Sequence, residues 1–384
     1  MPYDFDFLPE RRHSDSEKWA AFDEDVLPMW VADMDFLSPP AVIRALQERA
    51  AHGVFGYGVK NPPLIEAIVE RMERLYHWQV AAEEVILLPG VIPGFHLACL
   101  AVCEDHQGVL VQTPVYTPIL YAAKTTNKIP QEAPLHAGID GYYDIDWEVF
   151  EKSCDTNTRL FILSNPHNPV GRVFHRDELL KMAEICLRKG ITICSDEIHC
   201  DLIFPGYKHI PIASLDKEIA QNTITLMSPS KTFNLAGLKC SYAIIQNADL
   251  RQKYKQAAHG LISSVNLMGL VAGLAAYREG ADWLKELLEY LLQNCDAIYG
   301  YIQSNMPGIS MVKPEGTYLA WLDCRRLSLP ADAGDYFLKH ARVALNDGKI
   351  YGKEGEGFVR LNFGCPRSML MEALERMKNA ISNL

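Results

Sequence analysis

The sequence contains no uninterrupted apolar run long enough to cross a membrane. Its longest largely apolar stretch, residues 85–103, is broken by Pro89, Pro93 and His96, whereas a membrane-spanning helix needs about 20 consecutive apolar residues. The first residues have neither the basic segment nor the apolar core of a signal peptide. We therefore expect no membrane partner and a cytoplasmic location.

Runs of lysine or arginine are also missing. The 384 residues include 37 lysines and arginines against 48 aspartates and glutamates, which gives a formal net charge of −11. The sequence pI is about 5.6. A chain with this charge balance repels the phosphates of nucleic acids and of anionic lipids. The composition therefore argues against a nucleic-acid partner.

The ten cysteines form no Cys-x-x-Cys pair and are scattered along the chain. Several lie in apolar runs, for example Cys99, Cys186 and Cys194. Cys200 follows His199, but no second pair of this kind completes a zinc site. We expect reduced, buried thiols, as in cytosolic proteins, and no metal.

Internal repeats and low-complexity linkers are absent, so the fold class follows from hydrophobic periodicity. Short apolar segments alternate with amphipathic segments through the middle of the chain. This pattern predicts an α/β fold with a mostly parallel central sheet, helices on both faces, and a smaller α+β domain. The expected strands are residues 85–88, 109–112, 160–163, 191–194, 223–227, 242–245, 318–322 and 358–362.

The chain is longer than the roughly 250–300 residues at which a single core stops growing, so we expect two domains. We assign residues 46–280 to a large domain and residues 281–384 to a small one. The irregular segment 1–45 is expected to contribute to the small domain. Apolar residues at helical spacing predict helices at residues 62–77, 176–189, 281–305, 331–345 and 368–382.

Lys231 is the most informative single residue. It follows the apolar strand 223–227 and lies next to Ser228 and Ser230. Burial at a strand end disfavours the ammonium form and leaves an amine that can attack a carbonyl. Serine side chains beside it can hold a phosphate. This combination is typical of a lysine that binds pyridoxal phosphate (PLP) as a Schiff base, although a solvated loop lysine is the commoner explanation of any single lysine.

Polar and glycine-rich groups follow several of the expected strands. Ligands of open α/β sheets bind beyond the carboxyl ends of the strands, where such groups meet. A series of them along one sheet therefore predicts one site at that edge. The groups are residues 89–94, 113–116, 164–171, 195–199 and 228–231.

Each group offers something that a PLP site needs, and each has an ordinary structural explanation as well. Val91 and Ile92 start a helical segment whose N–H groups can hold phosphate, or they form a plain strand–helix turn. Asp196 can pair with the protonated pyridine nitrogen or cap the next helix. Asn168 can donate to the phenolate oxygen of the ring or serve a turn. Tyr116 can stack on the ring or pack in the core.

The ordered set of motifs resembles that of fold-type I PLP enzymes of the aminotransferase class I/II superfamily. It is most similar to the MalY/PatB group of cystathionine β-lyases, and it extends over nearly the whole chain. The motifs are residues 29–36 (MWVADMDF), 52–57 (HGVFGY), 165–171 (NPHNPVG), 195–199 (SDEIH), 228–237 (SPSKTFNLAG), 314–318 (PEGTY) and 360–364 (RLNFG).

The resemblance implies a role for each matched residue around the cofactor ring. It makes Lys231 the Schiff-base lysine, Asp196 the partner of the pyridine nitrogen and Asn168 the partner of the phenolate oxygen. Tyr116 would stack on the ring. The residues that it implies around the phosphate are Val91, Ile92, Ser228, Ser230 and Lys239.

The resemblance also implies a homodimer with shared active sites, because Tyr57 would reach the phosphate bound by the neighbouring subunit. Arg360 would clamp the substrate α-carboxylate with its two-pronged fork, and Tyr116 and Asp33 would lie on the substrate side. His199 is implied as a cofactor contact.

Two departures from the aspartate aminotransferase pattern favour the lyase group. His199 stands where those enzymes have a tyrosine, and Lys239 stands where they have an arginine. The resemblance thus implies a PLP-dependent carbon–sulfur β-lyase, a cysteine-S-conjugate β-lyase, that converts L-cystathionine or related amino-acid thioethers to a thiol, pyruvate and ammonia. An aminotransferase of the same fold shares the first steps and is the alternative. A PLP-fold protein with a regulatory role is a third hypothesis, against which the intact set of site residues argues.

Overall fold

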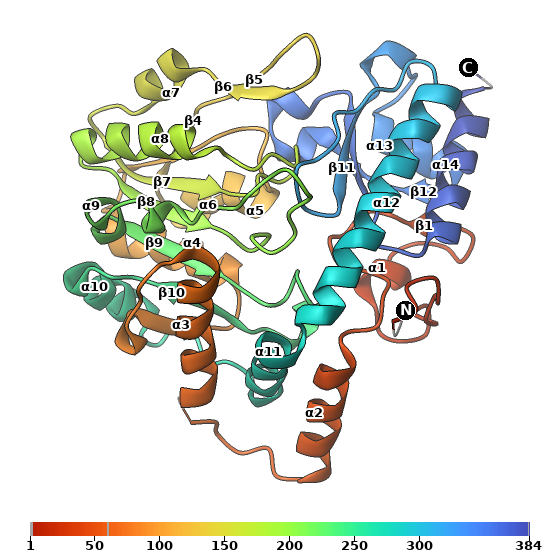
Figure 1. Cartoon of the computed structure of the whole chain (residues 1–384). Helices are drawn as coiled ribbons and strands as arrows, with labels where there is room; N and C mark the ends of the chain where they lie inside the picture. Colours follow the sequence, from red (N-terminus) through yellow and green to blue (C-terminus); the bar gives the residue numbers. More distant parts are fainter. Residues whose placement is uncertain (1–2, 60, 383) are drawn as a thin grey trace.

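The structure is a computed structural model that describes residues 3–59, 61–382 and 384. Its centre is a seven-stranded sheet in the order β2-β10-β9-β8-β7-β3-β4 (Figure 1). Only β10 among these strands is antiparallel to its neighbours, so the other six run in one direction. The bounds are β2 (Val85–Leu88), β3 (Gly108–Val111), β4 (Ile129–Glu132), β7 (Thr158–Ser164), β8 (Thr192–Asp196), β9 (Thr223–Met227) and β10 (Ser241–Ile244). The predicted mostly parallel α/β sheet is confirmed.

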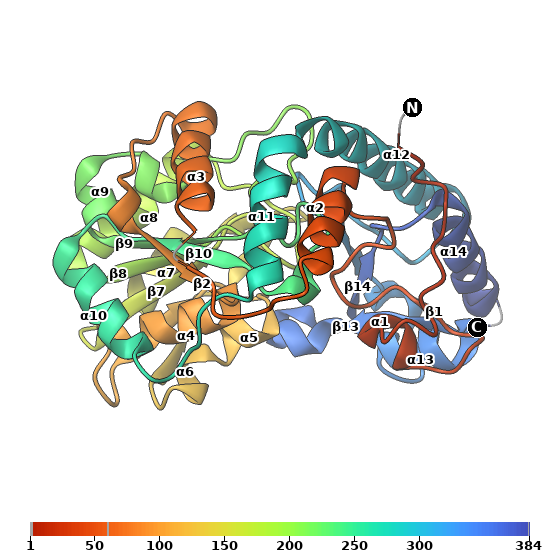
Figure 2. The ribbon, with the colours of Figure 1, turned by 90° about the horizontal axis from the view of Figure 1, so that it is seen from below.

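Both faces of the sheet are covered by helices, because successive side chains of a strand point to opposite faces. Phe161 and Leu163 of β7 pack in one core with α7 and α8, while Leu160 and Ile162 pack in another with α4 and α10. Figure 2 shows α8 and α4 on opposite sides of the sheet. The large helices of this part are α3 (Pro62–Tyr76), α4 (Val91–Val102), α7 (Trp147–Ser153), α8 (Arg176–Lys189), α10 (Ala248–Ala258) and α11 (Leu267–Glu279).

A smaller unit follows the long helix α12, which runs diagonally across Figure 1. It contains a sheet of order β11-β14-β13 and a parallel pair in which Leu27 of β1 lies beside Val343 of β12. The assignment of the N-terminal segment to the small domain and the boundaries at residues 45 and 280 stay predictions. The elements are β1 (Leu27–Pro28), α12 (Ala281–Asn305), β11 (Leu319–Asp323), α13 (Ala333–Ala341), β12 (Val343–Ala344), β13 (Asn346–Asp347), β14 (Phe358–Asn362) and α14 (Arg367–Ile381).

Most predicted elements are confirmed within two residues, but the helix predicted at 331–345 is too long. The helix α13 ends at Ala341, because Arg342 takes a left-handed conformation with φ of 55°. The apolar residues after it continue a helical spacing in the sequence, yet they form β12 against β1. The turn that follows brings Asn346 into β13, where it pairs with Arg360.

The segment 1–45 is less irregular than predicted. It contains the short helix α1 (Glu17–Ala20) and the start of α2 (Pro40–Ala51), whose first residue is a proline, as the first turn of a helix permits. The edge strand β4 was not predicted either, because it is mostly exposed and contains Pro130. The remaining elements are α5 (Thr117–Leu120), α6 (Ala122–Thr125), β5 (Leu135–Ala137), β6 (Tyr143–Ile145) and α9 (Lys217–Gln221).

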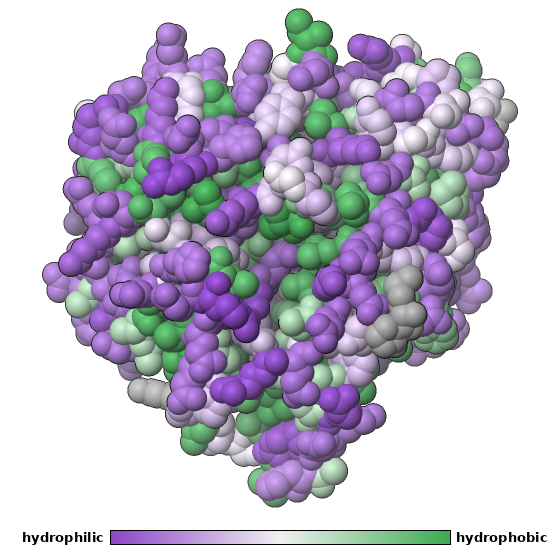
Figure 3. Space-filling view, in the orientation of Figure 1, coloured by the Kyte–Doolittle hydropathy of each residue, from purple (hydrophilic) through white to green (hydrophobic). Residues whose placement is uncertain are grey.

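The polarity of the surface and the state of the cysteines match what the composition led us to expect. The face in Figure 3 is mostly hydrophilic, with scattered hydrophobic side chains. All ten cysteines are buried and free, as predicted. Among the described residues no helix combines the length and the apolarity that a membrane span needs.

Candidate active site

The carboxyl ends of β2, β7, β8 and β9 surround a cavity of about 520 Å³. Since these strands run in one direction, the groups that follow them meet at one edge of the sheet, as predicted. The predicted site residues that line the cavity are Val91, Ile92, Tyr116, Asn168, Asp196, His199, Ser230, Lys231, Lys239 and Arg360.

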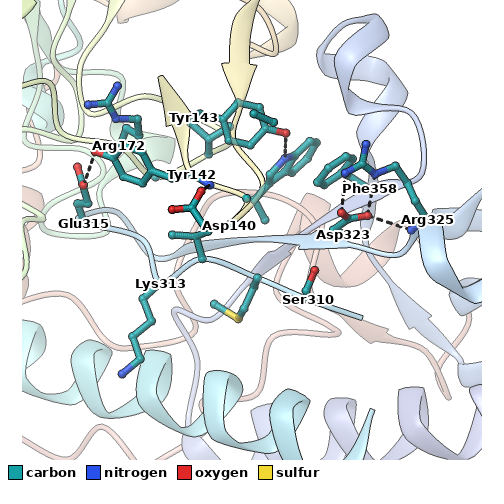
Figure 4. Close-up of a pocket in the computed structure, with 17 residues that line it drawn as sticks. Asp140, Tyr142, Tyr143, Arg172, Ser310, Lys313, Glu315, Asp323, Arg325 and Phe358 are labelled. Carbon is teal, nitrogen blue, oxygen red and sulfur yellow. Dashed lines mark hydrogen bonds and ion pairs between the residues drawn. The ribbon is translucent and has the colours of Figure 1, made fainter. Parts of the chain in front are cut away.

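Another cavity, shown in Figure 4, lies between the β5–β6 hairpin and residues 310–325. Its volume is about 60 Å³, enough for only a few water molecules at about 10–15 Å³ each. None of the predicted site residues lines it. The larger cavity is therefore the candidate active site.

Lys231 lines the large cavity, and a backbone carbonyl holds its amine. Its Nζ donates a hydrogen bond of 2.5 Å to the carbonyl oxygen of Ala32. Burial, with the positive charge of Arg360 as the second cause, lowers the pKa of Lys231 to about 8. The amine is therefore much closer to its nucleophilic, uncharged form at neutral pH than an exposed lysine is.

Asp196 lies at the end of β8 and is buried. Its Oδ1 accepts a hydrogen bond of 3.1 Å from the backbone N–H of Ile198. The pKa of Asp196 is raised to about 7, chiefly by burial; the hydrogen bond from Ile198 opposes this shift, and the neighbouring Glu197 adds to it. A carboxyl group in this state is stabilised by a cationic ligand placed beside it.

The ring of His199 lies next to Tyr318, with their centroids 6.0 Å apart in an edge-on arrangement. Burial lowers the pKa of His199 to about 3, with a smaller contribution from Lys231. Its Nδ1 is buried and has no hydrogen-bond partner in the described part of the chain. His199 therefore stays neutral beside Lys231 at physiological pH.

Arg360 enters the cavity from β14 and is held on three sides. Its Nη1 donates to Asn168 Oδ1 at 3.0 Å, and its Nη2 donates to the Trp30 carbonyl and to Asn346 Oδ1, both at 2.8 Å. Its Nε is buried, with no partner among the described residues. The guanidinium of Arg360 is thus fixed in place and keeps a donor for an anionic ligand such as a carboxylate.

The cavity lining also includes groups suited to a phosphate. The helix α4 begins at Val91, so its free N–H groups lie at the cavity wall beside Ser230 and Lys239. Ser228 lies one layer behind: it is buried, its Oγ donates to the Cys240 carbonyl at 2.7 Å, and it lies 2.8 Å from Ser230 Oγ.

The structure does not bring Tyr57 and Asp33 into the cavity lining. Tyr57 is fully exposed. The segment between α2 and α3, to which it belongs, lies at the lower edge of Figure 1. Asp33 forms an ion pair of 2.8 Å with Arg11 and lies 3.6 Å from Lys18. The roles implied for these two residues stay predictions.

Several lining residues were missed from the sequence, among them Trp30, Asn346 and Tyr351. Trp30 belongs to a motif that was recognised, but its contribution is a backbone carbonyl. Asn346 was missed because the segment before it was assigned to a helix. Tyr351 lies beneath the Arg360 guanidinium, 5.1 Å from ring centroid to Cζ.

No group of three or more histidine, cysteine, aspartate or glutamate side chains that could hold a metal ion occurs in residues 3–59, 61–382 and 384.

Comparison with known proteins agrees with this geometry. The family model for aminotransferase class I and II matches residues 24–377. Cystathionine β-lyase PatB of Bacillus subtilis (strain 168) is 41% identical over 387 residues, which cover 98% of this chain and 100% of PatB. The crystal structure of cystalysin from Treponema denticola, which contains a pyridoxal 5′-phosphate cofactor, is 34% identical and covers 100% of both chains with a TM-score of 0.96. The PLP-bound C–S lyase of Staphylococcus hominis is 32% identical and covers 99% of both chains with a TM-score of 0.93.

We predict that Lys231 of the cofactor-free protein reacts with an amine-selective acylating reagent in a pH range where ordinary lysines react poorly. Its labelling rate should reach half of its maximum near pH 8, because the amine loses its proton there rather than near the ordinary value of 10.5. Competitive labelling followed by peptide mass spectrometry measures this midpoint, with the exposed Lys152 as an internal reference. In Arg360→Gln the midpoint should move to higher pH, because a neighbouring positive charge is removed. A midpoint of Lys231 equal to that of Lys152 would contradict the buried amine.

Proposed function

Because this chain belongs to the aminotransferase class I and II family, we propose that it is a PLP-dependent carbon–sulfur β-lyase. It would cleave L-cystathionine or a related cysteine S-conjugate to a thiol, pyruvate and ammonia. The observation that carries the proposal is the meeting of Lys231, Asp196 and Arg360 in one cavity. Similarity to a cystathionine β-lyase over 98% of the chain supports the reaction type.

The groups around the cavity fit this cofactor. Lys231 would hold it covalently through its amine, and Asp196 would pair with its protonated ring nitrogen, which explains why a carboxyl group is buried there with one hydrogen bond. Asn168, Tyr116 and His199 would contact the ring. The groups that would bind its phosphate are the N-terminus of α4 with Val91 and Ile92, Ser230 with Ser228 behind it, and Lys239. When bound, PLP supplies an electron sink for the bond changes at the substrate amino acid.

The remaining groups bind the substrate and move its proton. The fork of Arg360 would bind the α-carboxylate and so orient the Cα–H bond. The Nζ of Lys231, with its pKa lowered to about 8, can take the proton from Cα and hold it. The neutral ring of His199 adds no charge that would compete with this transfer. Departure of the thiolate from Cβ then completes the elimination, and addition of one water converts the remaining three-carbon fragment to pyruvate and ammonia.

We also propose that the active protein is a homodimer with shared sites, in the cytoplasm. The segment before α3 exposes Val54, Phe55, Tyr57 and Val59, and a cluster of exposed apolar side chains marks an interface. The second copy of the chain would bury this segment and receive Tyr57 at its phosphate.

One assay tests the reaction type. Purified protein with PLP and L-cystathionine, without a keto acid, should release pyruvate and free thiol in equal amounts over many turnovers. Lys231→Ala should lose all turnover, because both the covalent holder of the cofactor and the base are removed. The outcome could also be that the wild type releases no more thiol and pyruvate than Lys231→Ala does. If the wild type then transfers the amino group to an added keto acid, the chain is an aminotransferase.

We predict that Arg360→Ala mainly raises KM. The loss of transition-state binding should be about 2–5 kcal/mol, as for truncation of one partner of a buried charge pair. Steady-state kinetics with one cysteine S-conjugate measures it, and Arg360→Lys is the matched control because it keeps the charge but loses the fork. An unchanged kcat/KM in Arg360→Ala would remove this residue from the substrate site.

We predict that two inactive variants restore activity when mixed. Lys231→Ala and Tyr57→Ala each lose activity alone, but a mixed dimer has one site with both wild-type residues. Random exchange of subunits should therefore restore about one quarter of the wild-type sites in an equimolar mixture, as two-fold symmetry requires. Size-exclusion chromatography with light scattering gives the assembly state of each variant. If mass measurement shows that mixed dimers form but the mixture gains no activity, the shared site is contradicted.

A further inference from the structure

Residues 314–318 connect the small domain with two loops of the large domain. On one side they contact the turn that carries Asn168, since the N–H groups of Glu315 and Gly316 donate to the Gly171 carbonyl at 2.9 and 3.3 Å. On the other side they contact the loop after His199, since Thr317 N–H donates to the Leu202 carbonyl at 2.6 Å. One short segment thus touches two of the loops that reach the cavity.

Glu315 uses all of its polar atoms in this connection. It is buried, and its backbone carbonyl accepts a hydrogen bond of 2.9 Å from Phe204 N–H. Its side-chain Oε2 accepts from Val173 N–H at 2.6 Å, and Oε1 accepts from the Tyr142 hydroxyl at 2.9 Å. Glu315 therefore holds the Asn168 turn through its side chain as well as its backbone.

The contact between these segments leaves no room for adjustment. A Cβ at Gly171, where φ is +78°, would lie 2.4 Å from Pro314 Cβ. A Cβ at Gly316 would lie 2.6 Å from the Leu202 carbonyl oxygen. Both glycines are required by the close approach of the backbones, so a shift of residues 314–316 moves the turn and the loop with it.

Tyr142 reaches this junction from the hairpin of β5 and β6. Figure 4 shows its hydroxyl pointing at Glu315, with the Arg172 guanidinium beside its ring, 4.7 Å from the ring centroid. The adjacent Tyr143 points the other way and accepts a hydrogen bond of 3.1 Å from Trp321 Nε1. Only Tyr142 among these two tyrosines touches Glu315.

The same junction sets the distance between Asn168 and Arg360. Residues 314–318 lead directly into β11, and β11 pairs with β14 so that Trp321 lies opposite Arg360. Arg360 in turn donates to Asn168. Glu315 thus holds the turn that carries the acceptor, Asn168. It also holds the strand pair β11–β14, which carries the donor, Arg360.

We propose that Glu315, held by the Tyr142 hydroxyl, is a positioning residue that aligns Arg360 with Asn168 for binding of the substrate α-carboxylate. The inference rests on the proposed function, since it assigns that carboxylate to Arg360. It predicts an effect on ligands that carry an α-carboxylate and none on simple amines.

The test compares Tyr142→Phe with Tyr143→Phe. Each variant removes one hydroxyl from the same hairpin and leaves one buried polar group without a partner, so both should lower the melting temperature. The affinity of the PLP-loaded protein for L-alanine and for ethylamine is read from the absorbance of the bound cofactor. In Tyr142→Phe the affinity for L-alanine should fall about tenfold, as for a lost hydrogen bond to a charged group, and that for ethylamine should stay unchanged.

Tyr143→Phe is the control variant, and Glu315→Gln is a second substitution at the same contact. Tyr143→Phe should bind both ligands as the wild type does. If Tyr142→Phe does not fold, Glu315→Gln takes its place, because it keeps Oε1 but turns a donor toward Val173 N–H; the same selective loss is expected. Equal losses for L-alanine and ethylamine, or the same loss in Tyr143→Phe, would overturn the proposal.

This experiment separates the inference from the reaction type. It needs only bound PLP and ligands without a leaving group on Cβ, so it gives an answer even if no thiol or pyruvate is released. With an active enzyme, Tyr142→Phe should raise KM for a cysteine S-conjugate by a similar factor and change kcat less than twofold.

Discussion

The guanidinium of Arg360 joins three parts of the chain that are far apart in the sequence. It binds Asn168 at the end of the central sheet, the carbonyl of Trp30 in the N-terminal segment, and Asn346 in the small sheet. A buried guanidinium is costly unless its donors are satisfied, so these contacts hold the three parts together around the cavity. The Nε of Arg360 is buried and has no hydrogen-bond partner among the described residues. The geometry of the site therefore depends on this one cation.

Burial is the physical cause behind the chemistry of the other site residues. It lowers the pKa of Lys231 to about 8 and that of His199 to about 3, and it raises the pKa of Asp196 to about 7. Each shift disfavours a charge that water would otherwise stabilise. Perturbed titrating groups gathered in one cavity are typical of a catalytic site. Here they supply an amine that can bind and move a proton, and a carboxyl group that favours a cationic partner.

Much of the fold and of the site was predictable because the signals are local. Strand and helix periodicity gave β2, β9, β14, α8 and α12 their observed bounds, and the groups after the strands meet at one edge because parallel strands must end together. The errors have non-local causes. The helix predicted through Leu345 ends early because Val343 pairs with a strand more than three hundred residues away. Asn346 was missed for the same reason, and no sequence pattern shows that the carbonyl of Trp30 faces Arg360.

The sequence by itself determined the residue types that make the chemistry possible: a lysine and an aspartate after apolar strands, glycines where backbones approach closely, and an arginine in a strand of the small sheet. These follow from neighbours along the chain, whose spacing and apolarity are visible in any window of a few residues. Only the tertiary structure decided which of them share a cavity, that Tyr57 is not among the residues that line it, and that Glu315 lies between two loops. Such contacts join residues far apart in the sequence, and their geometry depends on how the whole chain packs.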